Sequence, residues 1–412
     1  KSLHVSGPAS EQTLTARRDI TSMSMYTDAN GPMNSLHAAA DQSRAWLCDV
    51  AAPLWATRGR TVSGLFAERI ALNGQPDASY FRTFVQARHI FSFCAIGAMG
   101  WGGPWEALVG QTVDLLIQRA RRGDGFFVHR LDVQGNPLDG RADLYDQAFV
   151  LFALGAAGAA LGREYYFDVA EDLLSVIERS WSHPAGGFTE GEIVDARVRR
   201  QNPHMHLFEA AQALAEASKR ERFGALARTI GALARDRFLD RETGALLEYF
   251  DDRLTPAVGD EGRIAEPGHC FEWAWLFERL AKAGWTDGVA ISDLLTGFAR
   301  RTGIDFARGV AINEVFSDGT VRNPDARLWP QTERIKAAVS RFNRLETIDE
   351  ANEAVAAVRG LSQYFDVAIP GLWRDKLKED GSWIDELAPG SSLYHISCAF
   401  FELQGVKARA EA

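Results

Sequence analysis

Two histidines of this 412-residue chain are each followed by a glutamate three positions later, in segments of similar spelling. His206-Leu-Phe-Glu209 lies in RQNPHMHLFEA, and His269-Cys-Phe-Glu272 lies in EPGHCFEWAWLF. On a helix, positions i and i+3 share one face, so each carboxylate can orient its imidazole and raise its pKa. Histidine titrates near neutral pH and is the commonest general acid or base. The repeated pair predicts a site for proton transfer.

The first segment also contains His204, two positions before His206. On a strand, both rings of a His-x-His pair point to one side, as a zinc site could use. On a helix they diverge by about 200°, so only one of them faces a common cavity. The Glu-x-x-His pairs of di-iron bundles have the reverse order and further bridging carboxylates. We therefore expect no bound metal, a structural role for His204 at a helix start, and a cavity role for His206.

The elements that must position these residues are helices. Apolar spacing and Gly, Pro, Asn and Asp punctuation predict them near 34–54, 81–99, 103–121, 142–161, 164–181, 204–218, 221–238, 268–283, 288–305, 329–342, 346–365 and 391–405. Helices with a charged, half-exposed face alternate with helices that begin with aromatic and ionisable residues and then become apolar. The second kind begins about every sixty residues, which indicates repeated supersecondary units.

The stretches that enter these helices repeat as well. GFFVHRLDVQGNPLDG, GGFTEGEIVDARVRRQNP and GVAINEVFSDGTVRNPDARL each begin with Gly and apolar residues and then pass a polar turn. They predict short hairpins or long loops on one rim. Six helix pairs close into an all-α (α/α)6 barrel with six inner and six outer helices. An open helical solenoid is the rival, but it requires capping repeats and a less uniform inner set.

In a closed ring, the starts of the inner helices face one central cavity. The candidate residues at these starts are Arg88; Tyr145 and Asp146; His206 and Glu209; His269, Glu272 and Trp273; Trp329, Gln331 and Glu333; and Tyr394 and His395. Histidines that move a proton, an arginine that stabilises a developing oxyanion, and aromatic platforms suit an open-chain sugar. An inverting glycosidase would need a carboxylic acid opposite a carboxylate. The acidic residues leave that alternative open, and the histidine count weighs against it.

Composition limits the other possibilities. The formal net charge of −10 argues against nucleic acid or an anionic membrane as a partner. Four scattered cysteines predict reduced thiols and a cytoplasmic protein. The apolar run 148–162 is too short to span a bilayer and predicts a packed core helix. Residues 1–25 read as a disordered tail or an expression remnant, and 26–412 as one catalytic domain. Either a monomer or a homo-oligomer is compatible with the sequence.

At this point the motifs resemble a known family, the N-acylglucosamine 2-epimerase superfamily. QARHIFSF, LYDQAFVLFAL, NPHMHLFEA, PGHCFEWAWL, LWPQTE and LYHISCAF occur in the order and spacing of that family, over residues 34–405. The resemblance implies an (α/α)6 barrel that needs no organic redox cofactor. It implies a monosaccharide substrate whose pyranose ring opens with the help of a cavity histidine. The C2 proton is then managed by His269 and His395 through a cis-enediol. It also implies that Arg88 and His206 bind oxygens and stabilise the developing charge.

The remaining site residues come from the same resemblance. The implied substrate-binding residues are Tyr145, Asn202, Glu209, Glu272, Trp273, Trp329, Glu333, Asp385 and Tyr394. Of these, Asp385 comes from the loop before the last inner helix. NPHMHLFEA and SSLYHISCAF are similar to bacterial mannose isomerases, which predicts interconversion of D-mannose and D-fructose. A 2-epimerase acting on N-acylglucosamine, glucose/mannose or a β-1,4-disaccharide is the alternative. Arg130, Arg199 and Arg200 leave an anionic hexose open, and a non-catalytic sugar-binding protein is the alternative of another class.

Overall fold

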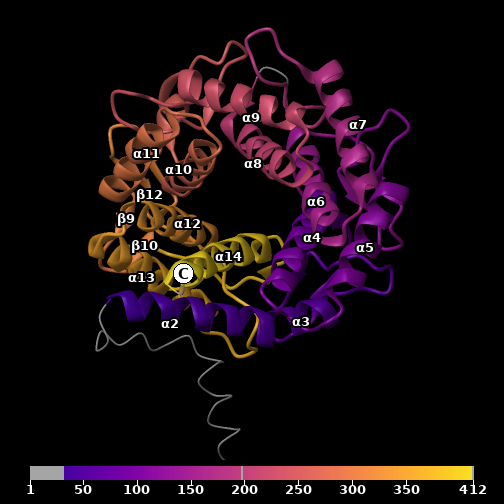
Figure 1. Ribbon diagram of the computed structural model, residues 1–412, viewed down its shortest axis with the longest axis horizontal. Coiled ribbons are helices and arrows are strands. Elements are labelled where there is room, and N and C mark those ends of the chain that lie inside the picture. The colour runs from indigo at the N-terminus through magenta and orange to yellow at the C-terminus, as the bar shows by residue number, and fades with distance from the viewer. Residues whose placement is uncertain (1–31, 196–197, 411–412) are drawn as a thin grey trace, which may run out of the picture.

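A computed structural model describes residues 32–195 and 198–410, so the tail predicted for residues 1–25 lies outside the described residues. The helices fall into two sets (Figure 1). The inner set is α4 (Thr83–Ala98), α6 (Leu144–Leu161), α8 (Gln201–Ser218), α10 (Pro267–Lys282), α12 (Leu328–Leu345) and α14 (Ser392–Ala410). The outer set is α2 (Pro32–Ala45) with α3 (Ala52–Thr57), α5 (Trp105–Leu115), α7 (Glu164–Trp181), α9 (Glu221–Leu233), α11 (Gly288–Thr302) and α13 (Ile348–Ser362).

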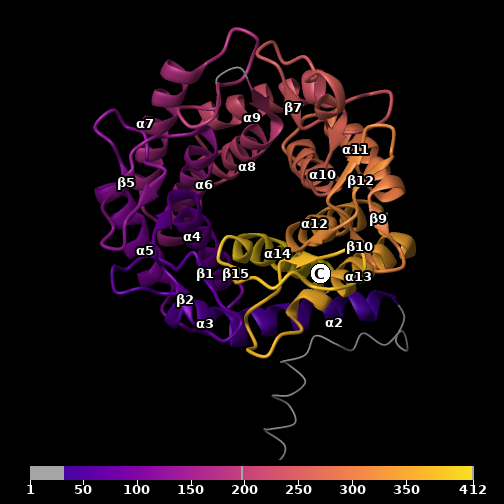
Figure 2. The same cartoon turned by 180° about the vertical axis from the view of Figure 1, so that it is seen from behind.

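The inner helices form a closed ring, which decides against the open solenoid. Each packs against the next, and α14 packs back against α4. The outer helices surround them, and the N-terminal α2 crosses beside α13 and α14 (Figures 1 and 2). The predicted (α/α)6 barrel is therefore confirmed. Buried Leu, Phe, Trp and Ala side chains between the two rings make the core.

Short antiparallel strands close the rim at which the inner helices begin. Most of the small sheets join a strand that precedes one inner helix to the hairpin of the next repeat. The strands are β1 (Arg69–Ile70), β2 (Pro76–Asp77), β3 (Phe81–Arg82), β4 (Arg130–Leu131), β5 (Pro137–Asp139), β6 (Arg199–Arg200), β7 (Tyr249–Phe250), β8 (Ile264–Ala265), β9 (Ile304–Asp305), β10 (Val310–Ala311), β11 (Glu314–Phe316), β12 (Val321–Asn323), β13 (Ala326–Arg327), β14 (Lys376–Leu377) and β15 (Ala388–Pro389). β15 pairs with β1, so the last repeat is joined to the first.

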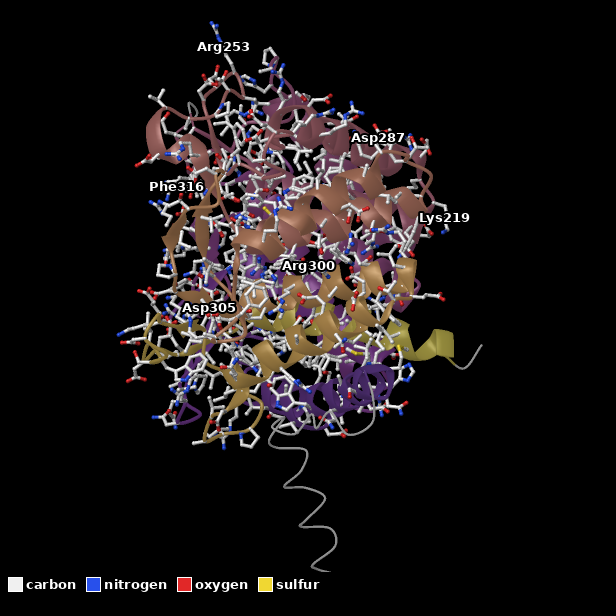
Figure 3. The ribbon with its side chains drawn as sticks, turned by 90° about the vertical axis from the view of Figure 1, so that its left-hand side faces the viewer. Lys219, Arg253, Asp287, Arg300, Asp305 and Phe316 are labelled. Carbon is white, nitrogen blue, oxygen red and sulfur yellow. The ribbon has the colours of Figure 1, made fainter. Side chains whose placement is uncertain are left out.

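The two ends of the barrel are built differently. In side view, the hairpins that carry Arg253, Asp305 and Phe316 lie at one end, and the short loops near Lys219 and Asp287 lie at the other (Figure 3). At the loop end a cavity of about 1080 Å³ is lined by Phe91, Trp275, Trp285 and Arg279, among others. The predicted site residues lie at the opposite, hairpin end of the inner helices.

Two sets of helix boundaries differ from the prediction. The helix predicted at 204–218 begins at Gln201, and Pro203 lies inside its first turn. Backbone N–H groups in a first turn have no intrahelical partner, so proline costs little there. Several outer helices end in a π-helical turn, for example at Leu116–Ala120 and Ala234–Phe238. Among the described helices, α6 is apolar and long enough to cross a membrane, but most of it is buried in the barrel, as predicted for a core helix.

Candidate active site

A five-residue motif begins each of the six hairpin loops and ties it to the inner helix that follows. Its first residue is a glycine with positive φ, a conformation that side chains other than glycine rarely adopt; the six are Gly64, Gly125, Gly186, Gly244, Gly309 and Gly371. In four of the six repeats, a side chain in the first turns of the following helix binds the backbone of the third residue. Gln86, for example, accepts from Phe66 N and donates to Phe66 O at 2.7 and 2.8 Å. Gln147 and Gln331 bind their loops in the same way.

The fifth residue of the motif is polar in every repeat. These residues are Glu68, His129, Glu190, Glu248, Asn313 and Asp375. Glu68, Glu190 and Asn313 accept hydrogen bonds from the backbone N–H groups of the residues that precede α4, α8 and α12. They cap helix starts whose N–H groups have no intrahelical partner. The equivalent Glu248 instead binds a side chain of α10, as described below.

This repeat explains why the two histidines of RQNPHMHLFEA differ. His204 takes the place of Gln86 and Gln147: its Nε2 accepts from Phe188 N at 3.0 Å, and the ring is buried. Gly187 leaves room for it, since a Cβ there would lie 2.6 Å from that nitrogen. His206 lies two positions later, with its ring 5.1 Å from that of Tyr145. The structure therefore agrees with the structural role predicted for His204 and places His206 with the site residues.

Replacing His204 tests this separation. His204→Ala should lower the free energy of unfolding by about 1–3 kcal/mol, because the buried Phe188 N–H loses its acceptor. Turnover at saturating substrate should stay within a few-fold of wild type. Urea unfolding and kcat measured on the same preparation check both expectations. A variant of unchanged stability with strongly reduced turnover would contradict the structural role.

His269 is held by two carboxylates from the preceding loop. Its Nδ1 lies 2.9 Å from Glu248 Oε1 and 3.6 Å from Glu266 Oε2. Burial disfavours the cation, but Glu248 and Glu266 outweigh it and raise the pKa of His269 to about 10. The predicted pairing of His269 with Glu272 is wrong. Glu248 takes this place because the hairpin brings it to Nδ1 of His269, while Glu272 faces α12, where Lys336 Nζ lies 3.6 Å away.

His395 has a separate carboxylate partner. Its Nδ1 lies 2.8 Å from Glu333 Oε1, and the other oxygen of Glu333 faces the ammonium of Lys336 at 2.5 Å. Burial and the positive charges of Arg88 and Lys336 lower the pKa of His395 well below its usual value. The two histidines are therefore in opposite ionisation states near neutral pH, His269 cationic and His395 neutral.

Trp329 joins the two histidines into one site. Its ring centroid lies 4.7 Å from that of His269 and 5.8 Å from that of His395. Gly268 makes this packing possible, because a Cβ there would lie 2.5 Å from the indole. The structure thus brings one aromatic ring together with a cationic and a neutral histidine, a combination that suits packing on a sugar and acid–base chemistry.

Arg88 and its neighbours complete the wall of the site. Its guanidinium donates to Tyr145 Oη at 2.8 Å and to Ser391 O at 3.3 Å, and it lies 4.9 Å from the ring of Tyr394. Tyr394 donates its hydroxyl proton to Glu209 Oε2, and His206 Nδ1 lies 3.4 Å from the same oxygen. Within the described residues, Arg88 donates hydrogen bonds to a phenol and a carbonyl, so its charge is available to a substrate oxygen.

Asn202 lies one turn before His206, at the start of α8. Its Oδ1 is buried and makes no hydrogen bond to the described part of the chain. An unpaired buried acceptor costs free energy unless a ligand or water satisfies it. Asn202 therefore fits the predicted substrate-binding role.

Two predicted substrate-binding residues are not with the others. Trp273 is fully buried, stacks on Phe208 and donates its indole N–H to Gln201 Oε1 at 2.6 Å. It supports the wall behind His269 and presents no face to a ligand. Asp385 is exposed. The buried aspartate of that loop is Asp375, which accepts from Ser392 Oγ at the start of α14.

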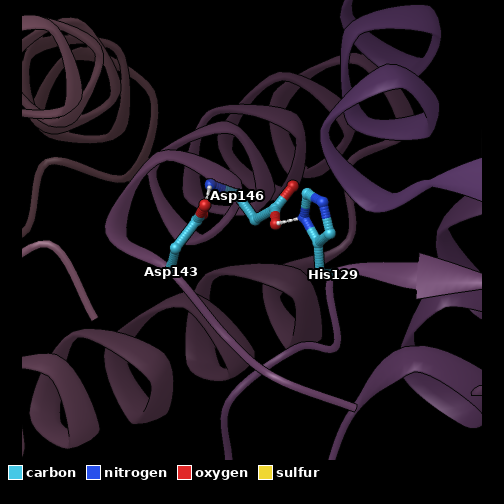
Figure 4. Close-up of side chains that lie close together, drawn as sticks. All are labelled: His129, Asp143 and Asp146. Atoms are coloured by element: carbon cyan, nitrogen blue, oxygen red, sulfur yellow. Dashed lines mark hydrogen bonds and ion pairs between the residues drawn. The ribbon is translucent and has the colours of Figure 1, made fainter. Parts of the chain in front are cut away.

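Asp146, a candidate carboxylate for glycoside hydrolysis, is bound by His129 and Asp143 in a local cluster (Figure 4). Its Oδ2 lies 2.7 Å from His129 Nδ1, its Oδ1 accepts from Phe84 N at 3.1 Å, and Asp143 caps its backbone N–H. Burial raises the pKa of Asp146 to about 7. The cluster joins the starts of α4 and α6 and so supports Arg88 and Tyr145 from below.

Sequence reasoning missed three charged residues of the site: Glu248, Glu266 and Lys336. Glu248 had a detectable signal, since it is the fifth residue of GALLE and matches Glu68 in GLFAE and Glu190 in GGFTE. Glu266 is the residue directly before α10. Lys336 lies at i+3 from Glu333, but nothing in the local pattern distinguishes it from an exposed helical ion pair.

The family model for N-acylglucosamine 2-epimerase (GlcNAc 2-epimerase) matches residues 64–399. The chain belongs to the N-acylglucosamine 2-epimerase family. A mannose-6-phosphate isomerase of Rhizobium meliloti (strain 1021) is 38% identical over 379 residues, which are 90% of this chain and 97% of the relative. A cellobiose 2-epimerase of Eubacterium cellulosolvens is 25% identical and covers 60% of this chain and 68% of its own.

Solved structures show the same fold. A D-mannose isomerase superposes with a TM-score of 0.79 at 19% identity, over 92% of this chain and 100% of its own. The cellobiose 2-epimerase of Spirochaeta thermophila superposes with a TM-score of 0.82 at 20% identity, over 92% and 99%. As a member of the N-acylglucosamine 2-epimerase family, the protein is an enzyme, a sugar isomerase or epimerase, and its substrate is a small sugar.

Proposed function

We propose that the protein is an aldose–ketose isomerase that interconverts D-mannose and D-fructose. The observation that carries the proton-transfer chemistry is the pair of histidines, one cationic and one neutral, whose rings lie 4.7 and 5.8 Å from the ring centroid of Trp329. The choice of an isomerase over a 2-epimerase is supported by the spelling of NPHMHLFEA and by the 38% identity with the mannose-6-phosphate isomerase of Rhizobium meliloti. Isomerisation needs a base for the C2 proton and an acid for the carbonyl oxygen at the same time. Groups whose surroundings push their pKa values apart provide such a pair.

Each residue then has a distinct task. Neutral His395 removes the proton from C2 of the open-chain sugar, exchanges it with solvent, and delivers a proton to C1. Cationic His269 donates a proton to the C1 carbonyl oxygen as the cis-enediol forms. Now neutral, it takes the proton of the C2 hydroxyl as the C2 carbonyl of the ketose forms, and it is cationic again. Arg88 binds a substrate oxygen and stabilises the developing charge. His206, Asn202 and Glu272 bind hydroxyl groups.

The three rim arginines named from the sequence favour an uncharged hexose over a sugar phosphate. Arg199 is buried and donates to Gly186 O and Phe188 O. Arg200 is paired with Glu190 at 2.6 Å, and Arg130 lies 5.2 Å from the ring of Tyr80. A phosphate would have to displace these partners. We therefore infer that free mannose is the substrate, although the relative from Rhizobium meliloti is named for the phosphate ester.

A panel of hexoses followed by NMR tests the proposal. Mannose should yield fructose, with kcat/KM at least about tenfold higher than for mannose 6-phosphate, because an unpaired phosphate would cost over 1.4 kcal/mol. Glucose as the product from mannose would instead select the 2-epimerase, which inverts C2 with the same histidines. Binding of sugars without any turnover would select the non-catalytic alternative.

The acid role of His269 predicts a pH dependence. Because His269 must be protonated, kcat/KM should fall as the pH rises through its pKa of about 10. Glu248→Gln removes the nearest anion, so the basic limb of the profile should move to lower pH by about one unit or more. The matched control is Glu190→Gln, which removes the equivalent hairpin carboxylate from the start of α8 and should leave that limb in place. If the basic limb also stays in place in Glu248→Gln, the assignment of His269 as the acid is contradicted.

We also expect catalysis without a metal ion. Among the described residues, three groups of site side chains have ligand atoms close enough to hold a cation, one of which is Glu272, Glu333 and His395. Lys336 and protonated His269 already supply positive charge to these carboxylates. Dialysis against EDTA should leave the rate of fructose formation unchanged. A loss that one divalent metal reverses would contradict this expectation.

With four free, buried thiols, we place the enzyme in the cytoplasm.

A further inference from the structure

A fully buried lysine lies below the two histidines. Lys336, on α12, has its Nζ 2.5 Å from Glu333 Oε2, 3.6 Å from Glu272 Oε1 and 3.9 Å from the centroid of the Trp275 ring. Burial of an ammonium group costs several kcal/mol unless a buried anion compensates it. Here three buried carboxylates, those of Glu209, Glu272 and Glu333, surround a single lysine.

Glu333 connects this lysine to His395. One of its oxygens faces Lys336 and the other faces Nδ1 of His395 at 2.8 Å. An ionised Glu333 can only accept, so Nδ1 carries the proton and Nε2 has the free lone pair. A protonated Glu333 can donate to Nδ1, and the proton of the neutral ring then lies on Nε2, which cannot act as a base. The ionisation of Glu333 therefore decides which nitrogen of His395 is basic.

Whether Glu333 is ionised depends on Lys336. Burial and the charge of Glu272, with Glu209 acting in the same direction, hold the pKa of Glu333 well above its usual value. Lys336 opposes them through its charge and its contact with the carboxylate. What favours the ionised form is the direct contact of Lys336 Nζ with Oε2 at 2.5 Å. Tyr394 and Cys398 are buried beside the same charged groups. Burial raises the pKa values of both side chains well above their usual ones, so both are neutral.

We propose that Lys336 is a positioning residue of the reaction: its ammonium keeps Glu333 ionised, and Glu333 in turn keeps the proton of His395 on Nδ1 and Nε2 free to accept the C2 proton. The proposal rests on the proposed function in one respect, the role of His395 as the base. Lys336 itself touches no substrate atom and acts through Glu333.

Lys336→Met tests the proposal, because methionine keeps an unbranched apolar stem beside Trp275 and removes the charge. We expect kcat to fall by about 10²-fold, the size of effect seen when an orienting partner is removed, with little change in KM. The acidic limb of the kcat profile should move to higher pH, because the loss of a nearby positive charge makes protonation of the Glu333–His395 pair easier. Lys336→Arg keeps the charge and should keep the limb in place. Lys282→Met, at an exposed position on α10, is the control.

A second measurement needs neither sugar nor turnover, so it also separates this proposal from the proposed function. In ¹⁵N-histidine NMR of the wild-type enzyme between pH 6 and 9, His395 should be the neutral tautomer protonated at Nδ1, with its signals assigned by their loss in His395→Gln. In Lys336→Met the proton should move to Nε2. A wild-type His395 protonated at Nε2 would overturn the proposal even if Lys336→Met fails to fold. A folded Lys336→Met with wild-type kcat, pH profile and tautomer would overturn it as well.

Discussion

His395→Asn should lower kcat for conversion of mannose to fructose by about 10²–10⁴-fold, the usual contribution of a general base. The variant loses the neutral imidazole that removes the C2 proton, while asparagine can still donate an amide hydrogen bond to Glu333. Binding should be affected much less, because Arg88, His206 and Trp329 keep their positions. The decisive readout is exchange of the C2 proton of mannose in D₂O, which should stop together with fructose formation.

His204→Ala is the matched control for this loss, since it removes a buried histidine that takes no part in the chemistry. Its exchange rate should stay close to that of wild type. Retained C2 exchange in His395→Asn would show that another group removes the proton, and the base would have to be reassigned. If His395→Asn were inactive only because it is unfolded, it would lack the cooperative unfolding transition in urea. Unfolding curves of His395→Asn and His204→Ala would show this.

His269→Gln should produce the second large effect. It removes the cation that protonates the carbonyl oxygen, so kcat should fall by about 10²–10⁴-fold. It should also abolish the basic limb of the pH profile, because that limb reports deprotonation of His269. Loss of the basic limb of the pH profile distinguishes His269 from His395. Removal of His395 takes away the base and changes the acidic limb instead.

The unfolding free energy gives an independent check on His269. Its folded-state pKa of about 10 lies above the unfolded value near 6.5. The stabilisation is therefore fully present below pH 6.5 and is lost as the pH rises towards 10. His269→Gln should flatten the decline of stability across this window in urea titrations. An unchanged decline would mean that His269 is neutral in the folded protein, and the acid role would fail with it.

Much of the fold could be predicted because the repeat is local. Each inner helix carries its own apolar run and its own polar start, and a spacing of about sixty residues is visible without any contact information. The separation of His204 from His206 was predictable for the same reason, since helical geometry alone turns the two rings apart. Local periodicity was therefore sufficient to predict the barrel and most residues of the wall.

The partners of the histidines were not predictable from local spacing. Glu248 reaches His269 across 21 positions of sequence, and Glu333 reaches His395 across 62, because hairpin pairing and ring closure bring them together. The i+3 rule placed Glu272 on nearly the same face as His269 but could not rank it against a carboxylate from another element. Lys336 shows the same limit, since its burial follows from the closure of the inner ring.

Incubation of D-mannose in D₂O with catalytic amounts of the wild-type protein, followed by ¹H and ¹³C NMR, tests the central claim most directly. The account predicts fructose as the product, deuterium from solvent at its C1, and loss of the C2 proton signal of mannose at equilibrium. Mannose that keeps its C2 proton while no ketose forms would contradict the account.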